Sequence, residues 1–195
     1  CDMRESFVLD EPKPVRLDEP DVQAAVISLY DSSLIKKTDL GSTIFNLILS
    51  PGTVLKLGSS SSTNGLGGYH GSVHIQRAGK TVTLYYSANV YSEVQANGHE
   101  NGIAVFNKPW KNVVGTLYHE LNEFRTDPDV NDAIVNNSND FLGWTSRSGR
   151  EVGDQPIFVA TNLNQVFKEV KASTGSKRIP VQFMYSNAVH GAEGP

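Results

Sequence analysis

The chain has 195 residues, of which 38% are hydrophobic and 19% are charged, proportions that indicate a globular protein. Its formal net charge is -4 and it has no basic run, so nucleic acid is not expected as a partner. No apolar run approaches the roughly 20 residues needed to span a bilayer, so no membrane span is expected. Cys1 is the only cysteine, which rules out an intramolecular disulfide.

The N-terminal segment differs in composition from the rest of the chain. Residues 1–20 are rich in proline and acidic side chains, which predicts an extended arm. Residues 21–195 are expected to form a single domain, because this length suits one hydrophobic core. Within the domain, Asp21 is predicted to cap a helix over residues 22–35, with Val22, Val26, Leu29 and Tyr30 on one face.

Short apolar segments separated by Gly, Ser and Asn predict several strands. Strands are expected over residues 44–49, 54–57, 102–106 and 181–185. Residues 72–76 and 81–87 alternate and are joined by a connector that contains glycine, which predicts a β-hairpin. The polar segment 58–71 is predicted to be a loop, whereas residues 164–172 have helical spacing. The pattern favours an α+β fold with a mostly antiparallel sheet and few helices.

A longer amphipathic helix is predicted over residues 110–125, with Pro128 stopping it. Its apolar side chains recur at helical spacing and form one stripe: Val113, Val114, Leu117, Leu121 and Phe124. We expect this stripe to pack on the core. The opposite, polar face is then expected to look outward, into solvent or into a cleft.

The polar face of this helix carries a candidate metal site. His119 and Glu123 are separated by four positions, so both side chains project from one side of the helix and can reach one metal ion. Glu120 lies on the flank, where it can act as a general base. This is the geometry of the zinc-protease helix, with a carboxylate in place of the usual second histidine.

A catalytic zinc ion needs three protein ligands and one open position for water. Asp154 is the preferred third ligand, because it ends the polar segment 150–154 after a Gly-rich turn. Asp127, just past the predicted helix, is the next candidate, although it has an equally good interpretation as a turn residue before Pro128. Glu151 is the third candidate.

Several short motifs follow one another in an order that resembles a known family. The motif His-Glu-Leu-x-Glu-x-x-Thr-Asp-Pro spans residues 119–128, and Gly143-Trp144 and Glu151-Val152-Gly153-Asp154 follow it. Further matches are Leu49-Ser50-Pro51-Gly52, Gly68-Tyr69-His70 and Tyr185-Ser186-Asn187. Over about residues 44–187 the chain therefore resembles secreted zincin-like proteins related to the plant phosphate-induced (Exordium-type) proteins.

The resemblance implies a zincin-like, metalloprotease-like domain that is secreted or extracellular. It implies that His119 and Glu123 are zinc ligands and that Glu120 is the base. It also places His70 near the site as a ligand, a proton donor or an oxyanion-stabilising group. The chain lacks the family's cysteines, with Gly67 at one of those positions, which removes disulfides but no ligand.

Other polar residues have less specific interpretations. The loop over residues 127–140 is rich in aspartate and asparagine, and is a candidate Ca²⁺ site through carboxylate and amide oxygens. Trp144 is expected to lie in the core or in a cleft wall. His74 is expected to be structural, while His99 and His190 are expected to face solvent.

These features predict a zinc-dependent hydrolase, most plausibly a metalloendopeptidase acting on a peptide or protein substrate. Glu120 would take a proton from water, and a strand over residues 102–106 would align an extended substrate by strand addition. The alternative is a catalytically silent secreted module that keeps the metal and binds a protein or carbohydrate partner.

Overall fold

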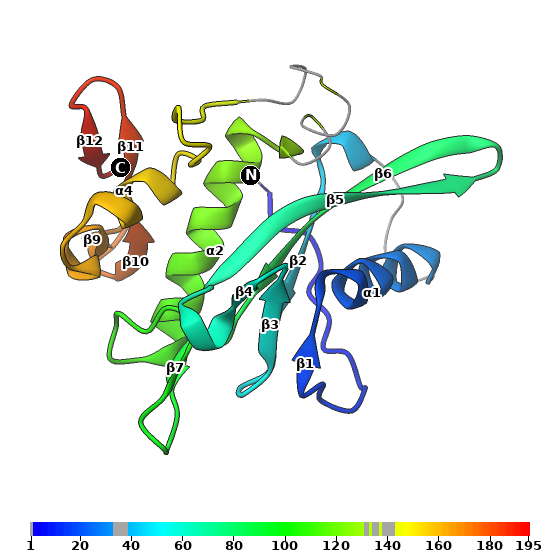
Figure 1. Ribbon diagram of the computed structural model, residues 1–195, viewed down its shortest axis with the longest axis horizontal. Helices are drawn as coiled ribbons and strands as arrows, with labels where there is room; N and C mark the ends of the chain where they lie inside the picture. Colours follow the sequence, from blue (N-terminus) through cyan, green and yellow to red (C-terminus); the bar gives the residue numbers. More distant parts are fainter. Residues whose placement is uncertain (1, 33–38, 131–132, 134–136, 138–142) are drawn as a thin grey trace.

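The computed structural model describes residues 2–32, 39–130, 133, 137 and 143–195. Its helices are α1 (Glu19–Asp31), α2 (Pro109–Thr126) and α4 (Asp154–Val159). Its strands are β1 (Arg16–Leu17), β2 (Ile44–Ile48), β3 (Val54–Leu57), β4 (Ser60–Ser61), β5 (Gly68–Arg77), β6 (Lys80–Asn89), β7 (Glu93–Val94), β8 (Glu100–Asn101), β9 (Phe167–Lys171), β10 (Arg178–Gln182), β11 (Met184–Ser186) and β12 (Gly191–Glu193). The expected α+β class is therefore confirmed (Figure 1).

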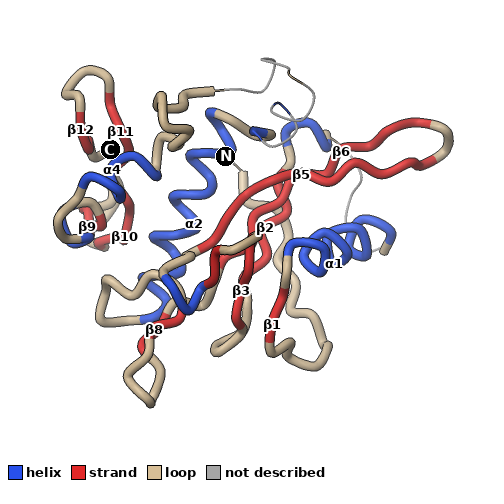
Figure 2. Tube along the Cα trace, viewed as in Figure 1, coloured by secondary structure: helices blue, strands red, loops and turns tan. Residues whose placement is uncertain are grey.

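Most strand pairings are antiparallel, but β1 pairs with β3 and β2 pairs with β6 in parallel. Figure 2 shows that much of the chain between these short strands is loop and turn. Among the described helices, none combines the length and apolar character that a membrane span requires, as the sequence predicted.

The long β5–β6 hairpin is the central element of the fold (Figure 1). Its turn places Ala78 and Gly79 at positive φ, which lets two residues reverse the chain. The predicted hairpin is confirmed, but it is longer than expected. Residues 68–71, predicted to be loop, are the first residues of β5, because they pair with residues 86–89 of β6.

Side-chain alternation gives the hairpin two different faces. One face packs on the core with α1, and its buried members are Tyr69, Ile75, Leu84, Tyr86 and Ala88. Val22, Val26 and Tyr30 of α1 belong to this cluster, as their helical spacing predicted, whereas Leu29, predicted on the same face, is only partly buried. The even-numbered side chains of β5 point to the other face, so His70 faces α2.

Helix α1 begins earlier than the sequence predicted. Its N-cap is Asp18 rather than Asp21, and the Asp21 carboxylate accepts a hydrogen bond from the Asp18 backbone N–H at 2.9 Å. The expected arm over residues 1–20 is also too long, because β1 within it pairs with β3. The arm was overestimated because Pro20 sits in the first helical turn, where proline costs no hydrogen bond.

Helix α2 forms over the predicted residues, but its polar face, which borders a cleft, is more buried than most of the predicted apolar stripe. Its buried residues are Asn112, Val113, Gly115, Thr116, His119, Glu120 and Glu123, whereas Val114 is exposed and Leu117, Leu121 and Phe124 are only partly buried. The helix lies between the hairpin and the C-terminal strands, and it packs against β5, β6 and β10 (Figure 1). Periodicity identifies the two faces of a helix but not which face meets a neighbour.

Two other predictions were wrong. Residues 102–106 are not a strand: Gly102 has a φ of +83°, and side chains of Ser92 and Asn112 accept the hydrogen bonds of Ile103 N–H and Phe106 N–H. Residues 164–172 are not a helix but mostly β9, which pairs antiparallel with β10. Three apolar residues in so short a segment are compatible with the spacing of a helix and with that of a strand, so the pattern does not distinguish the two.

The predicted final strand, over residues 181–185, is split between β10 and β11. Strand β11 pairs with β12, and its Tyr185 N–H donates to Val152 O at 2.8 Å. This bond fixes the segment that contains Glu151 and Asp154. Trp144 stacks on Tyr185 with ring centroids 4.5 Å apart.

The assigned hydrophobic core can be tested by substituting one buried and one exposed residue. Leu84 of β6 is fully buried on the hairpin face that packs against α1. Leu84→Ala should therefore destabilise the protein by about 2–5 kcal/mol, through lost apolar burial and the cavity left behind. Ile48 is 54% exposed, and Ile48→Ala should change stability by less than about 0.5 kcal/mol. Urea unfolding of both variants tests this; equal losses of stability would contradict the assigned core.

Candidate metal and catalytic site

The buried face of α2 presents three polar side chains together. His119, Glu120 and Glu123 are 9%, 2% and 2% exposed, and their ligand-type atoms all lie within 4.8 Å of one another. His119 Nε2 lies 2.9 Å from Glu123 Oε2. The predicted i,i+4 pair therefore meets on one side of the helix.

His70 approaches the same carboxylates from β5. Its Nδ1 lies 3.5 Å from Glu120 Oε2 and 3.8 Å from Glu123 Oε2. Its Nε2 lies 3.0 Å from the backbone oxygen of Asp127. The hairpin alternation that turns His70 toward α2 thus brings a residue from a distant strand into the helix cluster.

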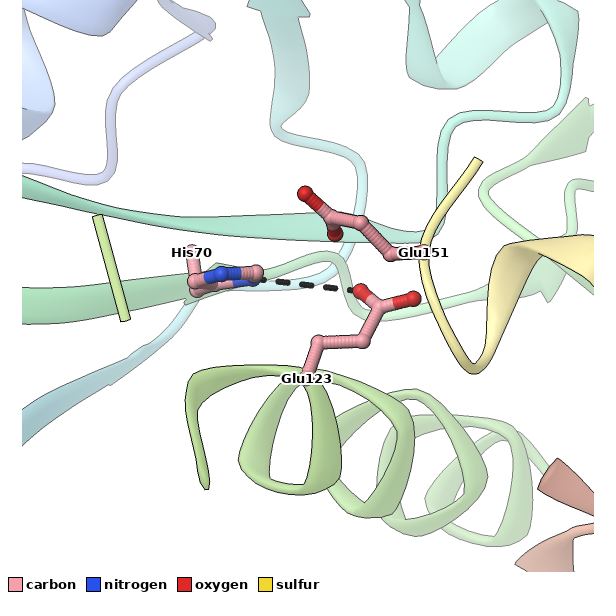
Figure 3. Close-up of side chains that lie close together, drawn as sticks. All are labelled: His70, Glu123 and Glu151. Carbon is pink, nitrogen blue, oxygen red and sulfur yellow. Dashed lines mark ion pairs between the residues drawn. The ribbon is translucent and has the colours of Figure 1, made fainter. Parts of the chain in front are cut away.

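The segment before α4 closes the cluster from a third direction. The backbone N–H groups of Gly153 and Asp154 both donate to Glu123 Oε1 at 3.1 Å. Asp154 Oδ1 lies 3.9 Å from His119 Nε2. Glu151 lies on the side of Glu123 that faces His70, and Figure 3 shows these three side chains converging.

Gln182 of β10 fixes the orientation of the His119 ring. Its amide N–H donates to Gly153 O at 2.5 Å, so its Oε1 is the atom that faces His119 Nδ1 at 2.8 Å. An amide oxygen only accepts, so His119 Nδ1 is the donor. In the neutral ring, the lone pair is then on Nε2, which faces Glu123. A partner on the far nitrogen is the usual support of a metal-binding histidine.

The electrostatics of the cluster depend on its burial. Burial alone lowers the pKa of both histidines, but the nearby carboxylates outweigh it. Glu120 raises the pKa of His70 to about 9, with further contributions from Glu151 and Glu123. Glu123 and Glu120 likewise raise the pKa of His119 well above its usual value. Burial raises the pKa of Glu123, but the charge of His119 reverses this and lowers it.

Three further carboxyl groups have raised pKa values. Burial and the charge of Glu123 raise the pKa of Glu151 to about 9 and that of Asp154 to about 6. Burial also raises the pKa of Asp127 to about 6, although the Thr126 hydroxyl donates to it. Each of these carboxyl groups therefore keeps its proton to a higher pH than a free carboxyl group does, Glu151 most of all.

The donor set suits a metal ion. Imidazole nitrogen and carboxylate oxygen together are ligands that Zn²⁺ accepts. His119 Nε2 and Glu123 Oε2 face one another, the other His119 nitrogen is already engaged by Gln182, and Asp154 lies beside them. The ligand-type atoms that lie within 4.8 Å of one another around this pair belong to His119, Glu120 and Glu123, so Asp154 as the third ligand stays a prediction.

A cleft opens beside these residues. It has a volume of about 120 Å³ and is bordered by His119, Glu120, Thr116 and Asp154, with Ile103, Ile157, Phe158 and Phe167 as its apolar walls. Thr116 Oγ1 is buried and has no hydrogen-bond partner among the described residues. A wider depression of about 330 Å³ shares Ile103 and Ile157 with the cleft and continues along Ala104 and Val105.

The structure thus brings five predicted site residues together: His70, His119, Glu120, Glu123 and Asp154. Asp127 contributes its backbone oxygen to His70, while its carboxylate Oδ1 accepts from Thr126. His99 and His190 are exposed, and His74 hydrogen-bonds to Thr83. Much of the candidate Ca²⁺ loop, including Asp132 and Asp140, lies outside the described residues.

Sequence reasoning missed the residues that support the site. Gln182 is a fully buried polar residue beside Val181 in β10, and its place in an apolar segment was the available signal. Gly68 and Gly153 are also unforeseen contacts. A Cβ at Gly68 would meet Glu120 Oε1 at 2.9 Å, and one at Gly153 would meet His119 Nδ1 at 2.6 Å.

Comparison of the chain with protein-family models, with curated proteins and with solved structures found no match. The resemblance to the zincin-like family therefore stays a prediction from the motifs, and the interpretation of the site depends on its geometry.

The close contact of Gly153 with His119 and Glu123 can be tested by adding a methyl group at this position. Gly153→Ala should displace the His119 ring or the 151–154 segment and cost about 1–3 kcal/mol of stability, since the added methyl has no room. Gly41→Ala is the matched control, because a Cβ there meets nothing within 4 Å. Thermal and urea unfolding measure the difference. Equal stability of the two variants would contradict the described packing.

Proposed function

We propose that the protein is a zinc-dependent hydrolase that cleaves peptide bonds. One observation carries the proposal: His119 and Glu123 meet at 2.9 Å on the buried face of α2, with Glu120 beside them at the border of a cleft. A ligand pair, a carboxylate base and an adjoining space for a substrate are the parts that metal-assisted hydrolysis requires.

His119, Glu123 and Asp154 would hold the metal. When bound, zinc supplies a Lewis acid that polarises a substrate carbonyl and lowers the pKa of water. Gln182 holds the His119 ring, and the Gly153 and Asp154 N–H groups hold Glu123 Oε1. The side chains of His119 and Glu123 are therefore oriented without a metal ion.

Glu120 would act on the proton of the attacking water. Its carboxylate accepts that proton as the water oxygen bonds to the carbonyl carbon, and then delivers it to the departing amine nitrogen. His70, 3.5 Å from Glu120 Oε2, positions this carboxylate from the β5 side. The Thr116 hydroxyl, which has no hydrogen-bond partner among the described residues, borders the same cleft but is buried, so a substrate or water group would reach it only if the cleft widened.

The walls of the cleft suggest the substrate. Ile103, Ile157 and Phe158 offer an apolar surface next to His119, which suits an apolar side chain flanking the scissile bond. The depression along Ala104 and Val105 gives room for further residues of an extended chain. A zincin-like fold and a secreted location, which the motifs suggest, belong to the same proposal.

A metal-containing module without catalytic activity is the second candidate, and one observation favours it. Glu120 is only 2% exposed, and Gly68 lies against it, since a Cβ at Gly68 would meet Glu120 Oε1 at 2.9 Å. If the cleft does not open, the metal would be structural and the protein would bind a protein or carbohydrate partner instead.

The third prediction separates these two functions. Glu120→Gln should keep the fold and the zinc content but lower peptide hydrolysis by about 10²–10⁴-fold, because an amide cannot accept the proton of water. Cleavage of a peptide library with apolar residues is the measurement. Glu193→Gln, at an exposed position in β12, is the control. Equal hydrolysis by parent and Glu120→Gln would refute the mechanism, and no hydrolysis by the parent would favour the binding module.

The fourth prediction concerns the ligands. His119→Ala and Asp154→Asn should each weaken zinc binding at this position by at least about 10-fold, since each removes one donor. Asp127→Asn should leave zinc affinity within a few-fold, because the carboxylate Oδ1 bonds to Thr126. Competition titration against a zinc-binding dye measures the affinities. A loss in Asp127→Asn without a loss in Asp154→Asn would reverse the assignment of the third ligand.

A further inference from the structure

A second cluster of metal-type ligands lies on the other side of Glu123. Ligand atoms of His70, Glu123 and Glu151 all lie within 4.8 Å of one another, and the three side chains come from β5, α2 and the segment before α4 (Figure 3). The first cluster, with His119 and Glu120, shares only Glu123 with it. Each cluster therefore contains one of the two histidines.

The orientation of His70 is that of a metal ligand. Its Nε2 faces the backbone oxygen of Asp127, which can only accept, so Nε2 carries the hydrogen. In the neutral ring, the Nδ1 lone pair then points at Glu120 Oε2 and Glu123 Oε2, which are acceptors too. Three acceptors that face one another require a proton or a metal cation between them. A backbone carbonyl on the far nitrogen is a common support of a ligating histidine.

The negative charge around Glu123 also favours bound cations. Five carboxyl groups gather here, those of Glu120, Glu123, Asp127, Glu151 and Asp154, and within the described part of the chain none of them forms an ion pair with Lys or Arg. Asp127 Oδ2 is buried without a hydrogen-bond partner among the described residues. If all five are ionised, they outnumber the two histidines, and one zinc ion would still leave a negative excess in a buried region that only protons or a second cation could balance.

We propose that the site binds two divalent cations that share Glu123 as a ligand. The first is held by His119 and Glu123 of the first cluster together with Asp154, while Glu120 stays free as the base, as in the proposed function, on which this inference rests through the shared carboxylate. The second is held by His70 and Glu151. Imidazole and carboxylate donors at the second position suit Zn²⁺ and related transition-metal ions.

A second cation would change what His70 does. His70 would be a ligand rather than a proton donor, and it would place positive charge beside Glu120. Pairs of metal ions that share a carboxylate are used in hydrolases to stabilise both the attacking and the leaving group. The protein would then belong with two-metal hydrolases rather than with those that use a single zinc ion.

The test is the metal stoichiometry of the full chain, measured without any activity assay. Protein freed of metal by chelation is titrated with Zn²⁺, and bound zinc is counted by elemental analysis after gel filtration. The parent should bind two equivalents. His70→Gln and Glu151→Gln should each bind one, and His119→Ala should also bind one.

Two control variants carry the same substitutions at exposed sites. His99→Gln and Glu193→Gln should bind two equivalents, because neither residue lies near the cluster. Circular dichroism checks that each variant is folded. Where Glu151→Gln fails to fold, Glu151→Asp keeps the charge but withdraws the carboxylate by one methylene, and it should lower the affinity of one equivalent by at least about 10-fold.

The possible outcomes separate this inference from the proposed function. One equivalent in the parent that survives in His70→Gln and Glu151→Gln but is lost in His119→Ala would overturn the second position and leave the hydrolase site intact. One equivalent lost equally in all three variants would show a single shared ion and would also overturn it. No zinc in the parent would overturn both proposals, and a proton would then occupy the space between His70 and the carboxylates.

Discussion

The buried carboxylate of Glu123 connects two parts of the chain that are distant in sequence. Glu123 is only 2% exposed, and a carboxylate removed from water must have its lone pairs satisfied. Backbone N–H groups of Gly153 and Asp154 reach one oxygen, and His119 reaches the other. Helix α2 and the segment before α4 are therefore held together by hydrogen bonds to one charged group.

The two faces of the β5–β6 hairpin keep this polar cluster apart from the hydrophobic core. One face packs on α1 through residues such as Leu84 and Tyr86. The other face turns His70 toward α2, where Tyr85 packs edge-on against Phe124 at 5.3 Å. A single two-stranded element can thus support a dry core and a charged site, because alternate side chains point in opposite directions.

The cluster is electrostatically costly without a cation. Burial and mutual repulsion raise the pKa of Glu151 to about 9, while the carboxylates raise that of His70 to about 9 as well. Without a metal ion, bound protons neutralise part of the negative charge, and a metal ion must displace these protons when it binds. The buried polar face of α2 therefore depends on protons or another cation to balance its carboxylates.

The sequence by itself determined the elements that depend on local pattern. Periodicity predicted α2 and the spacing of His119 and Glu123, and alternation around Gly79 predicted the hairpin. Local pattern failed where distant neighbours decide the structure. In residues 102–106 two backbone N–H groups donate to the side chains of Ser92 and Asn112 instead of to a strand. Most of residues 164–172 form β9, because β10 pairs with them.

Only the tertiary structure decided which face of α2 is buried and which distant residues meet there. His70 was expected in a loop, but β6 extends the pairing of β5 far enough to place it opposite α2. Gln182 lies at the site and bonds to His119, because β10 packs against α2. Helical spacing fixes the angle between two side chains on one helix, but the atoms that surround them come from segments whose approach depends on the packing of the whole chain.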